Sequence, residues 1–241
     1  MFSEHFARQT DELKGALDKR LAARGTATLP GKEKDLRIYK EFYEYVRDLL
    51  PPLFSVGMGK VRSKKHVLNR TVDMIIFQKW CKRFLDLTGG YVLADQIFAF
   101  GSMETDLETR HIYNHASITE AVKTLYAQDA ELEENDLVPC FSILLSFKSS
   151  IPLLSHKKAL EDIAVEKDIA LNRETDLLCV LGQGIIIKDW ENQGAFKVIE
   201  TGEDTLMWFY ILMLEYLDRD GNLGFDPREY IKENKEYREY S

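Results

Sequence analysis

The chain has 241 residues, of which 45% are hydrophobic and 30% are charged, a composition typical of soluble globular proteins. This length suits one large domain with a sizeable core. The formal net charge of −8 argues against bulk, sequence-independent binding to nucleic acid, which needs a broad basic surface, but it leaves room for a local basic groove.

Cysteine usage and hydropathy predict a reduced, cytoplasmic protein. Cys81, Cys140 and Cys179 lie far apart and form no C-x-x-C pair, so neither a zinc ribbon nor a disulfide framework is supported. The N-terminal residues are charged and lack an apolar core, so no signal peptide is predicted. The longest apolar segment, residues 205–217, is too short to cross a bilayer, and no membrane partner is expected.

The first part of the chain predicts two helices followed by strands. Residues 3–24 carry apolar side chains at helical spacing, and so do residues 36–50, which Pro51 ends. Residues 54–63 and 71–80 are rich in β-branched and aromatic side chains and predict two strands joined by a basic connection.

The rest of the chain alternates between strand and helix patterns. Ser117 and Glu120 form a capping box that predicts the start of one helix, and Ser155 is expected to open the next. This order indicates an α/β sandwich around a mixed sheet. The expected elements are a strand over 91–103, a helix over 117–128, a strand over 139–149, a helix over 155–170, two strands within 176–190 and a helix over 203–218.

Asp73 is the first candidate for chemistry, because it lies inside the apolar stretch TVDMIIF. A carboxylate in an apolar strand is costly unless it is paired or ligates a cation. Two acids on neighbouring strands can hold Mg²⁺, which prefers oxygen ligands and can polarise a phosphate and activate water. The alternative is that Asp73 lies at a strand start and satisfies a turn.

Residues 42–63 (FYEYVRDLLPPLFSVGMGKVRS), 71–78 (TVDMIIFQ) and 91–107 (YVLADQIFAFGSMETDL) resemble a prokaryotic family related to the PD-(D/E)XK nucleases. In that family an LP-x-x-[FY]-x-V-G-x-G-x-V motif precedes an aspartate-bearing strand and then a strand with an E-V-K core. The similarity extends over roughly residues 30–230. It implies a restriction-endonuclease-like mixed β-sheet flanked by helices over residues 31–241, with an N-terminal helical extension over residues 1–30. It also implies a role in defence or mobile-element biology.

The resemblance assigns roles position by position. Asp73 matches the first metal-binding aspartate, and Asp95 lies where relatives carry a glutamate before the second strand. Ser102 stands at the position of the catalytic glutamate and Glu104 at that of the lysine. A helix glutamate of the family falls near Tyr39. The resemblance therefore implies a degenerate catalytic centre.

A rearranged centre is the alternative. Glu104 would then serve as the second acid, with Lys148 or Lys60 supplying the positive charge. This requires the strand to stay regular through Glu104, whereas Thr105 and Asp106 suggest a turn into a helix cap. In that case Glu104 and Asp106 would be solvated acids favoured by the helix dipole.

A basic run follows the first predicted strand and could line a phosphate-binding groove beside Asp73. The alternative is an ordinary solvated hairpin edge. The candidate nucleic-acid-binding residues are Lys60, Arg62, Lys64 and Lys65.

Residues 218–229 (DRDGNLGFDPRE) match the ligand positions of an EF-hand calcium loop. Leu223 stands where such a loop needs glycine, so a glycine-rich turn closing the last helix is the alternative. The candidate calcium ligands are Asp218, Asp220, Asn222, Asp226 and Glu229.

His111 and His115 have the i, i+4 spacing that can bind zinc on one helix face, with Glu108 near His111. No H-E-x-x-H motif accompanies them, so a surface helix is the favoured interpretation.

Three functions follow from these patterns. The first is a nuclease-like protein with a degenerate centre that binds nucleic acid or a protein partner in phage defence or counter-defence. The second is an active Mg²⁺-dependent nuclease that uses Asp73, Asp95 and Glu104. The third is a non-enzymatic assembly protein with an acidic surface.

Overall fold

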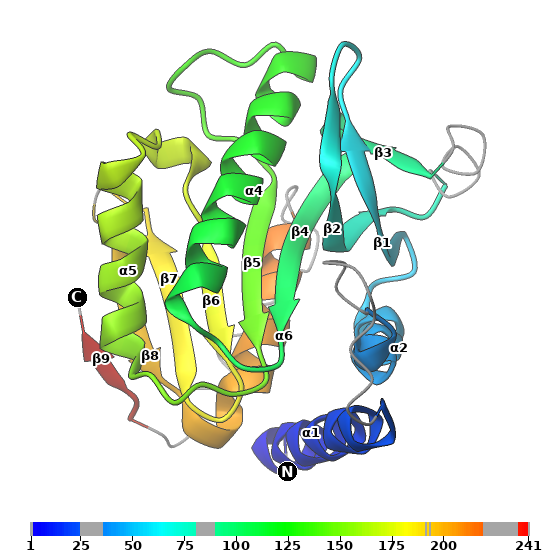
Figure 1. Cartoon of the computed structure of the whole chain (residues 1–241), viewed down its shortest axis with the longest axis vertical. Coiled ribbons are helices and arrows are strands. Elements are labelled where there is room, and N and C mark those ends of the chain that lie inside the picture. Colours follow the sequence, from blue (N-terminus) through cyan, green and yellow to red (C-terminus); the bar gives the residue numbers. More distant parts are fainter. Residues whose placement is uncertain are drawn as a thin grey trace.

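In the computed structural model the chain folds around one mixed sheet with helices on both faces (Figure 1). The sheet order is β3-β1-β2-β4-β5-β6-β7-β8-β9. The structure describes residues 2–24, 36–80, 90–190, 192, 194–218 and 236–240. The strands are β1 (Phe54–Arg62), β2 (Val67–Gln78), β3 (Tyr91–Leu93), β4 (Ile97–Glu104), β5 (Phe141–Ser146), β6 (Leu177–Val180), β7 (Gly184–Asp189), β8 (Ala195–Glu200) and β9 (Arg238–Tyr240).

Parallel and antiparallel pairings occupy different parts of the sheet. β4, β5 and β6 are parallel at its centre, and β1 and β2 form an antiparallel hairpin on one side. β7, β8 and β9 continue antiparallel on the other side. The predicted mixed sheet is therefore confirmed, with β8 and β9 as additional strands and with a 3₁₀ turn, Ala94–Gln96, interrupting the strand predicted over 91–103.

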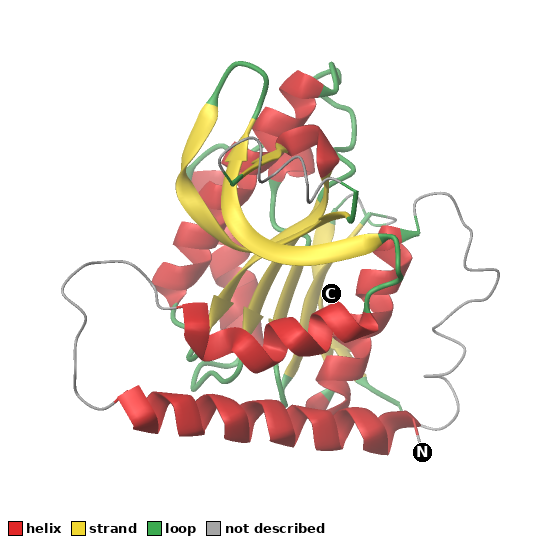
Figure 2. Ribbon diagram, turned by 90° about the vertical axis from the view of Figure 1, so that its right-hand side faces the viewer, coloured by secondary structure: helices red, strands yellow, loops and turns green. Residues whose placement is uncertain are grey.

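Helices cover both faces of this sheet, α4 and α5 on one face and α1, α2 and α6 on the other (Figures 1 and 2). Short 3₁₀ turns precede α2 (η1) and α6 (η4) and separate other elements (η2, η3). The helical elements are α1 (Phe2–Arg24), η1 (Leu36–Tyr39), α2 (Lys40–Leu49), η2 (Ala94–Gln96), α4 (Thr109–Asp129), α5 (Leu153–Glu166), η3 (Leu171–Arg173), η4 (Gly202–Asp204) and α6 (Thr205–Leu217).

The largest core lies between the sheet and helices α1, α2 and α6, because α6 is apolar along almost its whole length. Phe42 of α2 contacts Phe147 and Phe209 with ring centroids 5.8 and 5.9 Å apart. Phe6 and Leu13 of α1 belong to the same core, so α1 is packed onto the sheet domain. The boundary predicted at residue 30 lies outside the described residues.

Two helices begin earlier than the sequence pattern predicted. The capping box of α4 is formed by Glu108 and His111, whereas Ser117 lies inside the helix and donates to the Tyr113 carbonyl. Helix α5 starts after Pro152, so Ser155 lies in its first turn. Helix α4 thus starts eight residues and α5 two residues earlier than predicted, and in both the serine that looked like a cap belongs to the helix.

None of the described helices combines the length and apolar character that crossing a bilayer requires. Cys140 and Cys179 are buried as free thiols, and Cys81 lies outside the described residues.

Candidate active site

Asp73 lies in the middle of β2 at a β-bulge. Pairing with β1 places Asp73 and Met74 together opposite Met58, so β2 carries one extra residue there. Bulges of this kind redirect a side chain and are frequent beside active sites. Since β2 begins at Val67, Asp73 does not lie at a strand start, and the turn interpretation of this residue was wrong.

Two neighbouring elements hold Asp73 in place. Its Oδ2 accepts a 2.9 Å hydrogen bond from the Met103 amide of β4, and its backbone carbonyl accepts one from the Tyr43 hydroxyl of α2. Burial, with the Asp73 charge as a second cause, raises the pKa of Tyr43, so this phenol remains a donor. Asp73 is 9% exposed as a residue, and the β4 amide sets the orientation of its carboxylate.

Glu104 lies at the end of β4 with its side chain toward α4. Pairing with β5 is unbroken through Glu104 and Ser146, so Ser102 and Glu104 share one face of the strand. The Ser102 hydroxyl lies 3.0 Å from His115 Nδ1, and Glu104 Oε2 lies 3.8 Å from His111 Nε2. The condition for a rearranged centre, a strand that stays regular as far as Glu104, is therefore met.

Tyr39 is a buried tyrosine on the α2 side of the sheet. Its pKa is raised first by burial, and then by the charges of Glu104, Asp73 and Tyr43. The geometric link between the two acids is the Met103 amide, which binds the Asp73 carboxylate and belongs to the residue before Glu104.

The two histidines of α4 have separate roles. His111 Nδ1 accepts a 3.1 Å hydrogen bond from the Glu108 amide, so the neutral ring carries its proton on Nε2, which faces Glu104. His115 is buried at 1% exposure, with Thr119 Oγ1 3.3 Å from its Nε2. His115 therefore joins α4 to β4, and the surface position expected for it was wrong.

Asp95 is not brought to the pair of acids. It lies in η2, before the first residue of β4, whereas Glu104 is the last residue of that strand. At about 3.3 Å per residue, Asp95 and Met103 are separated by roughly 25 Å. Asp95 therefore cannot share an ion with Asp73.

Lys148 follows β5 and lies beside the segment that follows Glu104. Its Nζ is 3.7 Å from Asp106 Oδ2, and its carbonyl accepts a 2.9 Å hydrogen bond from the Leu107 amide. The side chain is 67% exposed. The positive charge of Lys148 therefore lies beside Asp106, the residue two positions after Glu104.

The predicted basic run is distributed along the β1–β2 hairpin. Lys60 pairs with Thr71 near Asp73, while Lys64 lies at the turn, with its amide bonded to the Asp129 carboxylate at the end of α4. The turn is roughly 20 Å from Asp73 along β2. The four predicted residues, spread along this hairpin, are Lys60, Arg62, Lys64 and Lys65.

The two carboxylates could hold Mg²⁺ together with water molecules, but the described residues do not supply enough ligands to surround the ion with protein alone. Among the described residues no group of three or more His, Cys, Asp or Glu could hold a metal ion. Mg²⁺ is commonly bound through one or two carboxylates and keeps several waters, so Asp73 and Glu104 would suffice.

The calcium prediction falls mostly where the structure gives no description. Asp218 is the residue after α6. The other four candidate ligands, outside the described residues, are Asp220, Asn222, Asp226 and Glu229.

Sequence reasoning missed Tyr39 and Tyr43 as site residues. They lie four positions apart and were assigned to the apolar face of a helix, where aromatic residues usually serve packing. The Tyr43 hydroxyl reaches the Asp73 backbone only because α2 packs against the sheet, and no local signal in the sequence indicates this.

A scan against protein-family models and a search of the curated proteins give no match to this sequence. The chain is similar in structure to NucC of P. aeruginosa ATCC27853 in its cAAA-bound form, with 14% identity, a TM-score of 0.65 and coverage of 90% of this chain and 91% of that one. It is also similar to NucC of E. coli MS115-1, at 15% identity.

The cAAA-bound E. coli structure gives a TM-score of 0.66 with 90% of each chain covered, and the apo form gives 0.63 with 90% and 92% covered. At such low identity the likeness concerns the fold. The chain shares with these proteins a restriction-endonuclease-like fold over nearly its whole length, as the family resemblance of the sequence predicted.

Proposed function

We propose that this chain is a metal-dependent nuclease with Asp73 and Glu104 as its pair of acids. The observation that carries the proposal is the 2.9 Å hydrogen bond from the Met103 amide to Asp73 Oδ2, which places the Asp73 carboxylate beside the residue that precedes Glu104 on β4. Glu104 takes the part that the family pattern gave to the position of Ser102. The Ser102 hydroxyl itself is hydrogen-bonded with His115 Nδ1.

Mg²⁺ would be held by Asp73 and Glu104 and completed by water. When bound, such an ion polarises a phosphate oxygen and lowers the pKa of a coordinated water. The protein itself orients the two carboxylates. The Met103 amide fixes the Asp73 carboxylate, and the Nε2 proton of His111 faces Glu104.

Lys148 is the proposed source of positive charge for the phosphate that is cut. In the family pattern a lysine stands two residues after the second acid, and for Glu104 that position is Asp106. Lys148 Nζ lies 3.7 Å from the Asp106 carboxylate, so a lysine from the segment that follows the neighbouring parallel strand β5 reaches the same place.

The β1–β2 hairpin is proposed to bind the phosphate backbone. Residues 58–72 contain five lysines and arginines and no acidic residue, in a chain whose net charge is −8. A two-stranded β-ribbon fits the major groove of a duplex, and cationic side chains on it position the backbone.

Binding without cleavage is the second candidate function, and a specific observation favours it. Asp106 neutralises Lys148, and no lysine occurs on β4 itself. In that case the chain binds nucleic acid, or a protein partner, through the same surface and leaves it uncut.

The phage-defence context rests on the family resemblance of the sequence together with the fold shared with NucC. Since two of these NucC structures hold cAAA, that compound is a candidate effector of this chain. Plating phage on cells that express wild type or Asp73→Asn tests the context. A defence nuclease reduces plaques only with Asp73 intact.

Cleavage of labelled DNA and RNA in Mg²⁺ or Mn²⁺, with and without cAAA, tests the activity. Wild type is expected to cut, and Asp73→Asn to cut at least about 100-fold more slowly. Retarded but uncut nucleic acid would select the binding function. Cleavage that survives in Asp73→Asn would exclude this centre.

A further inference from the structure

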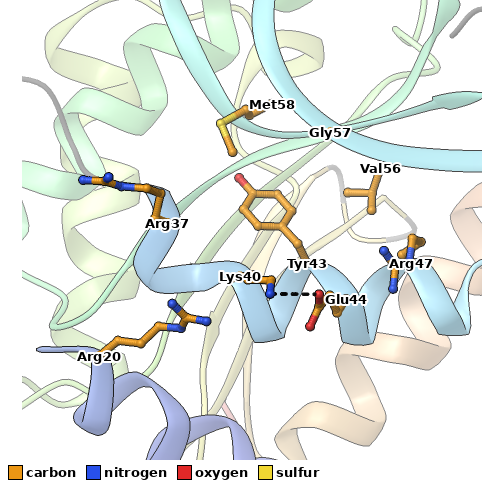
Figure 3. Close-up of a pocket in the computed structure, with 9 residues that line it drawn as sticks. All are labelled: Arg20, Arg37, Lys40, Tyr43, Glu44, Arg47, Val56, Gly57 and Met58. Carbon is orange, nitrogen blue, oxygen red and sulfur yellow. Dashed lines mark ion pairs between the residues drawn. The ribbon is translucent and has the colours of Figure 1, made fainter. Parts of the chain in front are cut away.

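We propose that the pocket between α2 and β1 binds the phosphodiester backbone of the nucleic-acid strand that enters the Asp73–Glu104 centre. The inference rests on the proposed function and adds to it a substrate-binding site. Figure 3 shows the pocket, with α2 on one side and β1 on the other.

The pocket is strongly cationic. Its volume is about 520 Å³, within the range of about 300–1,000 Å³ usual for ligand sites. Four positive side chains line it against one carboxylate, in a protein that is acidic as a whole. These charged residues are Arg20, Arg37, Lys40, Arg47 and Glu44.

Arg20 is held by the Glu41 carboxylate through two hydrogen bonds, so it contributes charge to the pocket rather than a free guanidinium. The ion pairs of Lys40 and Arg47 are weak enough to be exchanged for a phosphate. Lys40 Nζ lies 3.6 Å from Glu44 Oε1, and Arg47 Nε lies 3.3 Å from Asp48 Oδ1. The side chains of Lys40 and Arg47 are 61% and 60% exposed, and exposed pairs of this kind contribute about 0–1 kcal/mol. Arginine can bind a phosphate through two parallel hydrogen bonds.

Tyr43 connects the pocket to the acidic pair. Its ring lines the pocket, and its hydroxyl donates to the backbone carbonyl of Asp73. Met58, on the β1 wall, lies opposite the Asp73 bulge in the β1–β2 pairing. Neighbouring strands are about 4.8 Å apart, so a chain bound in the pocket passes close to the Asp73 backbone on β2.

The chemistry of the walls fits a nucleotide chain better than a bare anion. Val56 and Met58 add apolar surface beside the Tyr43 ring, and Met58 is 50% exposed. Sugars and bases can contact such surface while the phosphates meet the cations. β1 leads from this wall to Lys60 and the basic hairpin, so the positive surface continues along one strand. That continuity favours an extended strand over a small nucleotide.

The test compares three proteins by fluorescence anisotropy with short labelled single-stranded and duplex DNA, without divalent metal. They are wild type, Arg37→Ala with Arg47→Ala, and Arg8→Ala with Lys158→Ala. The last variant removes two exposed cations from α1 and α5, and Arg8 lies about 18 Å along α1 from Arg20.

The pocket variant is expected to bind DNA at least about 10-fold more weakly than the control variant. Its plot of log K against log salt should also be shallower by about two. DNA binding equal to that of the control variant would overturn the proposal. So would a pocket variant that loses only cAAA, titrated separately, and keeps DNA.

Thermal unfolding of each variant separates loss of binding from loss of fold. If the double variant unfolds, Lys40→Glu, an exposed change on α2, repeats the test with the same expected direction. The experiment distinguishes an error in the proposed DNA-binding pocket from an error in the proposed nuclease activity. Wild type that binds through the pocket without cutting contradicts only the nuclease, and wild type that cuts while both pocket variants bind normally contradicts only the pocket.

Discussion

The Met103 amide donates a 2.9 Å hydrogen bond to the Asp73 carboxylate, across the junction of β2 and β4. This bond exists because the bulge in β2 directs the Asp73 side chain toward the neighbouring strand. It places an acid of β2 beside the residue that precedes Glu104.

The same bond predicts how substitutions of Asp73 affect stability. Asp73→Asn keeps an oxygen acceptor for the Met103 amide and should change the free energy of unfolding little. Asp73→Leu leaves that buried amide without its acceptor and should cost about 1–3 kcal/mol. Urea unfolding of both variants measures the difference. Equal stability of the two would show that the bond does not hold the strands.

Asp106 should limit catalysis. Asp106→Lys places a lysine two residues after Glu104, at the spacing of the family pattern, and removes the carboxylate that lies 3.7 Å from Lys148. We expect faster cleavage than wild type, and slower cleavage in Lys148→Ala by about 10–100-fold. Initial rates in Mg²⁺ measure both. A rate for Lys148→Ala equal to that of wild type would remove Lys148 from the site.

The ion pair between Lys123 and Asp176 should dominate stability far from the site. Their side chains are 1% and 2% exposed, the charged atoms lie 2.7 Å apart, and the Asp176 carboxylate also accepts from Ser142. Lys123→Met leaves a buried charge unpaired and should cost about 3–5 kcal/mol.

Adding Asp176→Asn to Lys123→Met removes that charge and should recover part of the loss. Denaturant unfolding gives both values. A cost below about 1 kcal/mol for Lys123→Met alone would contradict the importance of the pair.

His156 should make the protein less stable in acid. It is fully buried against the Ser149 hydroxyl, and burial lowers its pKa from 6.5 to about 4. Between these values the unfolded chain binds a proton that the folded chain does not, so stability is full above pH 6.5 and is lost as the pH falls toward 4.

His156→Gln should remove this pH dependence, which is on the order of 3 kcal/mol between pH 7 and pH 4. The stability difference between wild type and His156→Gln should therefore shrink from pH 7 to pH 4. A difference that stays constant over this range would contradict the assignment.

The fold could be predicted because its signals are local. Apolar helical spacing and β-branched runs mark most elements, and α6 is apolar enough to require a sheet beneath it. Strands β8 and β9 were not predicted. Ala195–Glu200 is short and partly polar and Arg238–Tyr240 has three residues, so neither shows a clear alternation of apolar and polar side chains.

The site could be predicted only in part. Asp73 stands out as a carboxylate in an apolar strand, and Glu104 was recognised as an alternative acid. Asp95 was misplaced because the sequence pattern does not reveal that it lies in the 3₁₀ turn η2, at the opposite end of β4 from Glu104. Tyr39 and His111 were not predicted as site residues, because their relation to the two acids depends on the tertiary fold and not on spacing within their own helical segments.

The most direct test of the central claim compares cleavage of DNA and RNA by wild type, Glu104→Gln and Asp95→Asn in Mn²⁺. The paired carboxylates of Asp73 and Glu104 predict that Glu104→Gln loses at least about 100-fold in rate and that Asp95→Asn cuts like wild type. Cleavage that survives in Glu104→Gln but disappears in Asp95→Asn would contradict the account.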